Sequence, residues 1–195
     1  MSPADSTSNV TSKRYHHGDL RTALIETARA LLAAEQPFSL RAVAAAVGVS
    51  PAATYRHFSD RSGLEAAIAA QGYAELHDQL EAASKEITTA TELWRLAVAY
   101  AHWAVANHTI FHLMCTAQFN PEAPEKTTTV AAIVDFLQEQ LARWYPEQAG
   151  EAFFTGVWAL THGLTMLYLE NKLDISDMAA LEKRIQDVWA TMFPV

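Results

Sequence analysis

Hydrophobic residues recur every three or four positions along most of the chain, and this spacing predicts amphipathic helices. The first predicted helix covers residues 19–35, and one of its faces carries Leu20, Leu24, Ala28, Leu31 and Leu32. The alternation typical of strands is not sustained anywhere, and the sequence contains no Asn-Gly or Asp-Gly pair to close a hairpin. We therefore expect an all-α fold with about nine helices.

Start and stop residues divide the N-terminal part of the chain into short elements. Asp19 is placed to cap the first helix, and Pro37 ends it because proline removes a backbone donor. Ser39 is placed to cap a second helix, which ends at Gly48 because glycine readily adopts a positive φ.

Ser50 and Pro51 begin a third short helix, since serine caps a helix and proline at the first position loses no hydrogen bond. We expect this helix to end near Phe58, after which Asp60 caps a long helix over residues 61–85. The remaining helices are placed at residues 90–106, 109–118, 127–145, 149–171 and 177–192.

Charge is distributed unevenly along the 195 residues. The formal net charge is −8, which by itself argues against a nucleic-acid-binding protein. Residues 1–65, however, hold seven Lys and Arg against six Asp and Glu, whereas residues 66–195 hold seven against sixteen. A near-neutral segment with basic clusters is thus joined to an acidic one, which indicates two roles on one chain.

The sequence is typical of a cytoplasmic protein that does not enter a membrane. Cys115 is the one cysteine, so no intramolecular disulfide can form. No apolar run approaches the roughly 20 residues that cross a bilayer. Residues 1–17 are polar, lack the apolar centre of a signal peptide and are expected to form a disordered tail.

Two short helices joined by "AVGVS" are typical of a helix-turn-helix, whose second helix enters the major groove of DNA. Ala52 and Ala53 leave the start of that helix unobstructed, and Thr54 is placed to touch a thymine methyl group or a base edge. Tyr55 and His57 are placed to donate to phosphates. The alternative is a structural helical hairpin in which these are ordinary surface residues.

The stretch "SLRAVAAAVGVSPAATYRHFSDRSGLEAAI", Ser39–Ile68, resembles the DNA-binding domain of TetR/AcrR-family transcriptional regulators. It has the family's Gly-Val-Ser turn, its Tyr-x-His-Phe block and an acidic-basic pair before a leucine. "YHHGDLR", Tyr15–Arg21, resembles the start of one branch of the family. "VWALTHGL", Val157–Leu164, resembles the Trp-x-x-x-His-Gly stretch in the ligand domain of that branch.

The resemblance implies a homodimer with two DNA-binding heads, each of which reads half of a near-palindromic operator in double-stranded DNA. It implies a helix-turn-helix domain over residues 18–60 and a ligand-binding and dimerisation domain over residues 61–195, in which 61–85 is the linking helix. A small-molecule ligand is then expected to shift the heads apart and release the DNA. No cofactor is expected.

Residues expected to contact DNA come from the turn, the third helix and the cations around them. They are Arg41, Ser50, Pro51, Ala52, Ala53, Thr54, Tyr55, His57 and Arg61, together with Lys13 and Arg14 if the tail is a minor-groove arm rather than a solvated end. By the resemblance, Ala53 and Thr54 face the bases. Alanine side chains form no hydrogen bonds, so Ala52 and Ala53 cannot distinguish bases in that way. Arg41 and the shape of the DNA are therefore expected to contribute to recognition of the operator sequence.

The acidic region is rich in aromatic and sulfur-containing side chains, which is typical of a mainly apolar ligand pocket with a few polar anchors. The candidate polar anchors are His102, Asn107, Cys115 and His162. The candidate apolar lining residues are Trp103, Phe111, Met114, Trp158 and Met166. The effector is therefore expected to be partly apolar.

His108, His112 and Cys115 have the spacing i, i+4, i+7, which puts potential metal ligands on one face of a continuous helix. The competing interpretation is that His108 ends a helix and Cys115 is a small buried hydrophobic residue. We assign no metal site, and metal sensing stays an alternative.

Two apolar stripes predict a dimer interface in the form of a four-helix bundle. The stripe on the helix at 127–145 consists of Val130, Ile133, Val134, Leu137 and Leu141. The stripe on the helix at 149–171 consists of Phe154, Val157, Thr161, Leu164 and Thr165. The alternative is that both stripes face the core of one chain.

The sequence favours a ligand-released DNA-binding repressor and not an enzyme. It lacks a glycine-rich phosphate loop, a nucleophile with a recognisable histidine partner and paired carboxylates on a rigid frame. An activator, or a regulator that responds to no ligand, is the alternative within DNA binding. The rival class is a metal-binding or enzymatic helical protein that uses the histidine-rich C-terminal region.

Overall fold

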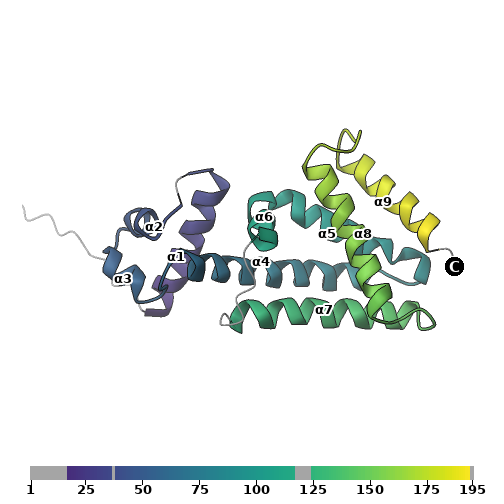
Figure 1. Ribbon diagram of the computed structural model, residues 1–195, viewed down its shortest axis with the longest axis horizontal. Coiled ribbons are helices and arrows are strands. Elements are labelled where there is room, and N and C mark those ends of the chain that lie inside the picture. Colours follow the sequence, from purple (N-terminus) through teal and green to yellow (C-terminus); the bar gives the residue numbers. More distant parts are fainter. Residues whose placement is uncertain (1–16, 37, 117–123, 194–195) are drawn as a thin grey trace, which may run out of the picture.

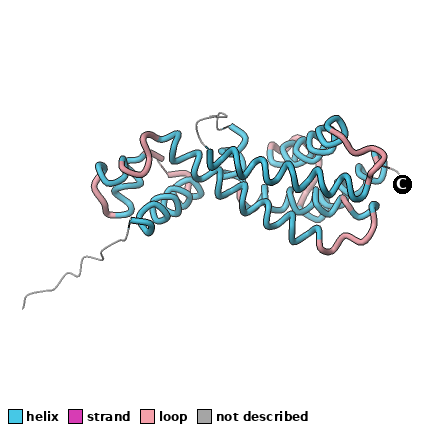
Figure 2. Tube along the Cα trace, turned by 90° about the horizontal axis from the view of Figure 1, so that it is seen from below, coloured by secondary structure: helices cyan, strands magenta, loops and turns pink. Residues whose placement is uncertain are grey.

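The computed structural model describes residues 17–36, 38–116 and 124–193, and over these residues the protein is all-helical, as predicted (Figures 1 and 2). The helices of the N-terminal head are α1 (His17–Ala33), α2 (Leu40–Val47) and α3 (Pro51–Tyr55). The others are α4 (Arg61–Ser84), η1 (Ala90–Glu92, a 3-10 turn), α5 (Trp94–Ala106), α6 (His108–Thr116), α7 (Pro124–Trp144), α8 (Glu151–Leu169) and α9 (Met178–Met192).

Several predicted boundaries are wrong by about one turn or less, as three examples show. Helix α1 begins at His17, so Asp19 lies inside its first turn and is not its N-cap. Helix α3 ends at Tyr55 rather than near Phe58, because Arg56 follows as its C-cap and the chain turns there. Helix α5 begins at Trp94, since residues 90–92 form a separate 3-10 turn. Pro37, Lys13 and Arg14 lie outside the described residues.

The long helix α4 organises the molecule. It runs from the head formed by α1, α2 and α3 into the larger C-terminal part, where α7 lies along it (Figure 1). Helices α5 and α6 also pack on α4, while α8 and α9 pack on α5 at the far end. One continuous apolar core follows α4, from Leu64 near the head to Leu80 near its C-terminal end.

The head is fastened to α4 by an ion pair as well as by apolar packing. The Arg29 guanidinium in α1 donates to both carboxylate oxygens of Glu75 in α4, at 2.6 and 2.8 Å. It also donates to the side-chain oxygen of Gln71 at 3.3 Å. Such a bidentate pair fixes geometry as well as adding energy, so the orientation of α1 follows that of α4.

Candidate nucleic-acid interface and ligand cavity

The turn between α2 and α3 is fixed by two local devices. Ser39 caps α2 through its hydroxyl, which accepts from the Ala42 backbone N–H at 3.1 Å. Gly48 ends α2 with φ 81° and ψ 30°, and its N–H donates to the carbonyls of Ala44 and Ala45. A side chain is disfavoured at this φ, so the glycine is required for the sharp exit that sends the chain into α3.

Helix α3 is five residues long and presents a nearly bare outer face. The Ser50 hydroxyl caps it by accepting from the Ala53 N–H at 3.3 Å, and Pro51 occupies its first turn. Pro51, Ala52 and Tyr55 are exposed, and Ala53 is half-buried. The small side chains let the backbone at the start of α3 come close to another surface, as a groove-reading helix requires.

The prediction that Thr54 faces the bases is wrong. Its side chain is completely buried, because Thr54 and Phe58 lie on the face of the α3 segment that packs into the head. Phe58 is buried too. The outer face of α3 is therefore even poorer in hydrogen-bonding groups than the sequence suggests.

Replacing Thr54 by valine is expected to raise the free energy of unfolding by about 1 kcal/mol and leave DNA binding unchanged. The Thr54 hydroxyl oxygen is buried and has no hydrogen-bond partner within the described part of the chain. Urea denaturation measures the change. Thr165→Val is the matched control, because the equally buried Thr165 hydroxyl donates to the Thr161 carbonyl at 2.9 Å, so its removal is expected to destabilise. Weaker operator binding by Thr54→Val would contradict its assignment to the core.

Three arginines are exposed around α3. Arg41 lies on α2, as predicted, and Arg56 follows α3 directly. Arg56 was not among the predicted contacts, although its place after Tyr55 at the helix end was a usable signal. Arg61 is exposed but already makes two contacts within the chain. Its Nε donates to Glu65 at 2.7 Å, and its guanidinium lies over the Phe38 ring at 5.0 Å. Half-buried His57 lies beside these cations in sequence.

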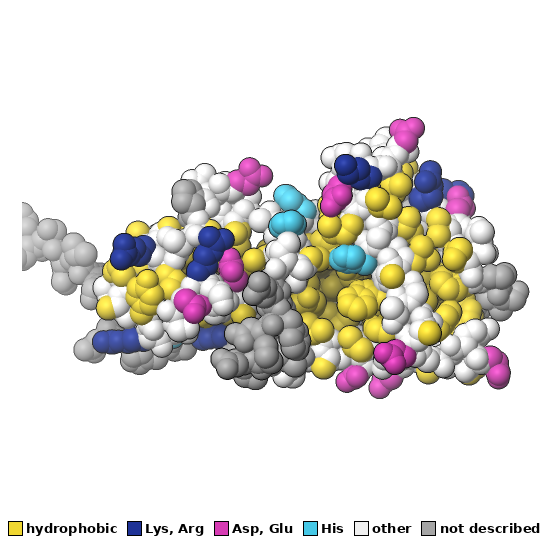
Figure 3. Space-filling model, in the orientation of Figure 1, with side chains coloured by type: hydrophobic (Ala, Val, Ile, Leu, Met, Phe, Trp, Pro, Cys, Tyr) yellow, Lys and Arg dark blue, Asp and Glu magenta, His cyan; other side chains and the backbone are white. Residues whose placement is uncertain are grey.

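The C-terminal part contains a cavity of about 300 Å³ between α4, α5, α6, α7 and α8. Figure 3 shows a hollow among hydrophobic side chains in this part of the surface, with a histidine beside it. Of the predicted pocket residues, the lining includes Phe111, Met114, Cys115, Trp158 and His162. Residues that the sequence did not single out complete it, chiefly Tyr73 from α4 and Tyr100 from α5.

Four of the predicted pocket residues do not line this cavity. His102 is exposed and pairs with Glu182 of α9 at 2.5 Å. Trp103 is buried against α4 beside Gly72, and the Asn107 amide donates to the Trp103 carbonyl at the end of α5. Met166 is half-buried against the core. Each of the four has a side chain that would suit a ligand pocket, but its position on the helix points it away from the cavity.

Hydrogen-bonding groups in the cavity wall come from tyrosine and histidine. The Tyr100 hydroxyl and His162 Nδ1 are 2.8 Å apart. Burial holds the pKa of His162 below its ordinary value and that of Tyr100 well above, so both groups are neutral at pH 7. The Tyr73 hydroxyl donates to the Met114 carbonyl at 3.3 Å, and burial, with a smaller effect of Cys115, raises the pKa of Tyr73 to about 12.

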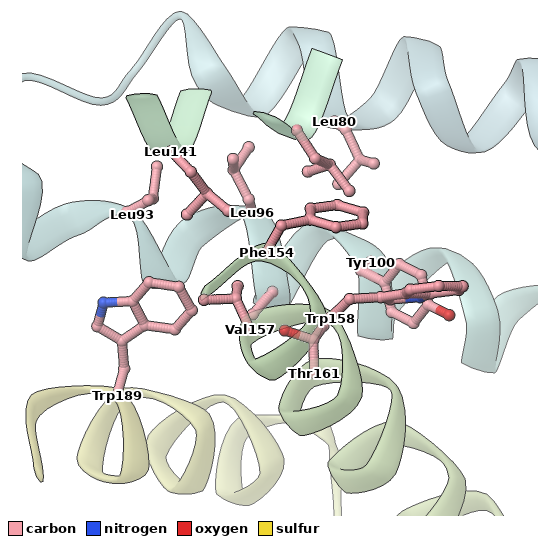
Figure 4. A pocket seen from close by; sticks show the side chains of 12 residues that line it. Leu80, Leu93, Leu96, Tyr100, Leu141, Phe154, Val157, Trp158, Thr161 and Trp189 are labelled. Atoms are coloured by element: carbon pink, nitrogen blue, oxygen red, sulfur yellow. The ribbon is translucent and has the colours of Figure 1, made fainter. Parts of the chain in front are cut away.

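A second, smaller chamber of about 40 Å³ adjoins the cavity (Figure 4). Its lining shares Tyr100, Leu137, Phe154 and Trp158 with the larger one. Phe154 and Trp158 are stacked, with ring centroids 5.9 Å apart, and Trp158 is 49% exposed. The two chambers therefore meet at one aromatic pair on α8.

The histidine and cysteine series on α6 does not assemble a metal site. His108 is the first residue of α6 and is exposed, as is His112. Among the described residues, one group of three potential ligands has its ligand atoms all within 4.8 Å of one another, and it is His77, Asp78 and Glu81. This group is largely exposed, and Glu81 pairs with Lys85 at 3.3 Å, so it is an ordinary charged surface.

The predicted dimer stripes are wrong as an interface, because they face the interior of one chain. Five of their members are buried within the chain, namely Ile133, Leu141, Phe154, Thr161 and Thr165. The others line the two chambers or pack against the core: Val130, Val134, Leu137, Val157 and Leu164. The alternative interpretation, that both stripes meet the core, is the one the structure supports.

The opposite face of α8 is apolar and open to solvent. It carries exposed Gly156, Ala159 and Leu167 and half-buried Leu160 and Gly163, spaced three and four residues apart. By length and composition α8 is the one helix in the described ranges that could cross a membrane, and 11% of its apolar window is buried. A Cβ atom placed on Gly156 or Gly163 would meet nothing within 4 Å. This face is called the α8 outer face below.

Comparison with known proteins identifies relatives of the head and of the whole fold. Residues 24–68 match the family described as bacterial regulatory proteins, tetR family. The whole fold is similar to a solved protein of unknown function from Rhodococcus sp. RHA1, with 28% sequence identity, a TM-score of 0.76 and coverage of 93% of this chain and 98% of that one. No curated protein matches the sequence.

Two solved regulators share the fold at lower identity. The fatty acid degradation regulator FadR from Bacillus halodurans has 15% identity and a TM-score of 0.67, with coverage of 86% of this chain and 93% of that one. The TetR family transcriptional regulator PfmR from Thermus thermophilus has 19% identity and a TM-score of 0.62, with coverage of 95% and 97%. At these identities the similarity concerns the fold.

Proposed function

We propose that this chain is a regulator of the TetR family, namely a cytoplasmic dimeric repressor that a small molecule releases from its operator. The observation that carries the proposal is the Gly48 turn, which sets a short helix with a bare outer face beside exposed Arg41 and Arg56. Such a helix reads few bases directly, so phosphate contacts and DNA shape supply much of the specificity.

Arg41→Ala is expected to weaken binding to the promoter region beside the protein's own gene about tenfold, through loss of a phosphate or base contact. Gel-shift titration at two salt concentrations measures the loss, and the salt dependence should become shallower. Arg143→Ala is the matched control, because Arg143 is an exposed arginine in the last turn of α7, at the end of that helix far from the head (Figure 1). An unchanged affinity for Arg41→Ala, or no salt-dependent DNA binding by the natural protein, would favour the rival enzymatic or metal-binding class.

The dimer is proposed to form through the α8 outer face, with α9 beside it. An apolar helix face that is mostly exposed in one chain is stabilised when another surface buries it. The same helix of a second copy matches this face in length and apolar character. The open space over Gly156 and Gly163 allows close approach of the partner helix. Two heads held in one dimer would then read the two halves of a near-palindromic operator.

Release is proposed to pass through α6, which contacts both α1 of the head and α4. Helix α6 lines the cavity with Phe111, Met114 and Cys115, so a molecule bound there contacts this helix directly. The Arg29–Glu75 pair then transmits a shift of α4 to α1. Because coupling between two binding sites is reciprocal, operator DNA and effector weaken each other's binding by the same factor.

A further inference from the structure

The Trp-x-x-x-His-Gly stretch on α8 brings Trp158 and His162 to the cavity wall, one helical turn apart. Tyr100 of α5 lies beside both: its ring is 6.3 Å from the His162 ring, centroid to centroid, and it lines both chambers together with Trp158. Figure 4 shows Tyr100 and Trp158 beside each other at the edge of the smaller chamber. The motif is therefore part of the cavity and not of the exposed α8 face alone.

The Tyr100 contacts determine which nitrogen of His162 carries the proton. Within the described ranges the buried Tyr100 hydroxyl has a single hydrogen-bond partner, the His162 ring, and a buried hydroxyl hydrogen needs an acceptor. The hydroxyl hydrogen, which is buried, is then directed to the acceptor 2.8 Å away, His162 Nδ1. A neutral imidazole whose Nδ1 accepts carries its hydrogen on Nε2. His162 Nε2–H has no partner within the described ranges, and it is the ring donor left for a ligand.

Among the residues that the structure describes, the lining holds no full charge. None of these thirteen residues is Lys, Arg, Asp or Glu, and five of them are aromatic. A carboxylate or phosphate buried against them would find no cation among them, and burying an unpaired charge is strongly unfavourable. At about 300 Å³ the cavity is at the small end of ligand sites, which suits a substituted single ring rather than a long chain.

We propose that Tyr100 orients His162 so that the imidazole donates from Nε2 to an oxygen acceptor of the effector, and that the effector is an uncharged, mainly apolar molecule with a carbonyl or ether oxygen. The inference rests on the proposed function only in taking the cavity as the effector site. His162 is thereby the residue that determines specificity, and Tyr100 is a positioning residue that acts through it.

Four probes of matched shape test the class of ligand: 4-phenylbutan-2-one, butylbenzene, 3-phenylpropanoate and 4-phenylbutan-2-amine. Titration calorimetry on the full chain, in the absence of DNA, measures their dissociation constants. The ketone is expected to bind at least about tenfold more tightly than the carboxylate and the amine, since neither charge finds a partner. Equal or tighter binding of either charged probe, or no binding of the ketone, would overturn the proposal.

Variants test the role of His162. In His162→Phe the affinity ratio of ketone to butylbenzene is expected to fall roughly three- to tenfold, the usual effect of one hydrogen bond, and the ratio corrects for any change in the apolar fit. His162→Gln, which keeps an N–H donor, should retain most of the ratio, and Tyr100→Phe should lower it without removing the imidazole. His102→Gln is the control at an exposed histidine that does not line the cavity. An unchanged ratio in both His162→Phe and Tyr100→Phe would contradict the proposed donor.

These measurements separate the inference from the proposed function. If the ketone binds with the expected pattern but does not release operator DNA, the cavity chemistry stands and ligand-released repression fails. If DNA is released by a charged molecule whose binding does not depend on His162, repression stands and the inference fails.

Discussion

Ala159→Glu is expected to convert the dimer to a monomer and to lower operator affinity about a hundredfold. Ala159 is exposed at the middle of the α8 outer face, between Gly156 and Gly163. In a symmetric dimer the substitution places a carboxylate from each copy in an apolar contact, where like charges cost several kcal/mol. Loss of the second head removes the gain of bivalent binding, which is about 10² or more. Sedimentation equilibrium and gel-shift titration measure the two effects.

Ala142→Glu is the control for this substitution. Ala142 is an exposed alanine on α7, on neither predicted stripe and not on α8, so the same added charge should leave the dimer intact. A dimer that persists in Ala159→Glu, together with a monomer in Ala142→Glu, would move the interface to α7. A natural protein that is monomeric at micromolar concentration would remove the dimer from the proposed function altogether.

The elements of the fold could be predicted because their signals are local. The Ser39 cap, the Gly48 exit and the Ser50-Pro51 start all act within a few residues, and each is found in the structure. Periodicity likewise identified α7 and α8 to within a few residues. Asp19 failed as a cap because α1 starts earlier, at His17, where the residue pattern gives no comparable signal.

The surface against which each helix face packs could not be predicted, because it depends on contacts between distant parts of the chain. Periodicity correctly grouped Ile133 with Leu141, but it could not tell a partner chain from the chain's own cavity. The same limit applies to Thr54, whose side chain suits a base edge equally well as a core position. The Tyr100–His162 pair joins residues 62 positions apart, and no spacing within one helix signals it.

Gly72→Val is expected to lower the free energy of unfolding by about 2–3 kcal/mol, because the contact between α4 and α6 has no room for a side chain. A Cβ atom on Gly72 would lie 2.7 Å from Met114 Sδ and 3.0 Å from Ile110 Cγ2, both on α6. The better helix propensity of valine offsets only about 0.4 kcal/mol of this strain. Urea denaturation measures the loss, and Ala74→Val, at an exposed position of the same helix, should cost only the lower helix propensity of valine, about 0.6 kcal/mol.

Gly72→Ala separates the effect of this contact on ligand binding from its effect on stability. Alanine adds one methyl group and gains up to about 1 kcal/mol of helix propensity, so the folded state is expected to survive. The methyl displaces the flexible Met114 side chain, which also lines the cavity, and the space left for a ligand shrinks. Binding of 4-phenylbutan-2-one should therefore weaken although the free energy of unfolding is largely kept, whereas Ala74→Val should leave this binding unchanged. Unchanged stability in Gly72→Val would show that α6 can move away from α4 without cost, and α6 could then not transmit ligand binding to the head.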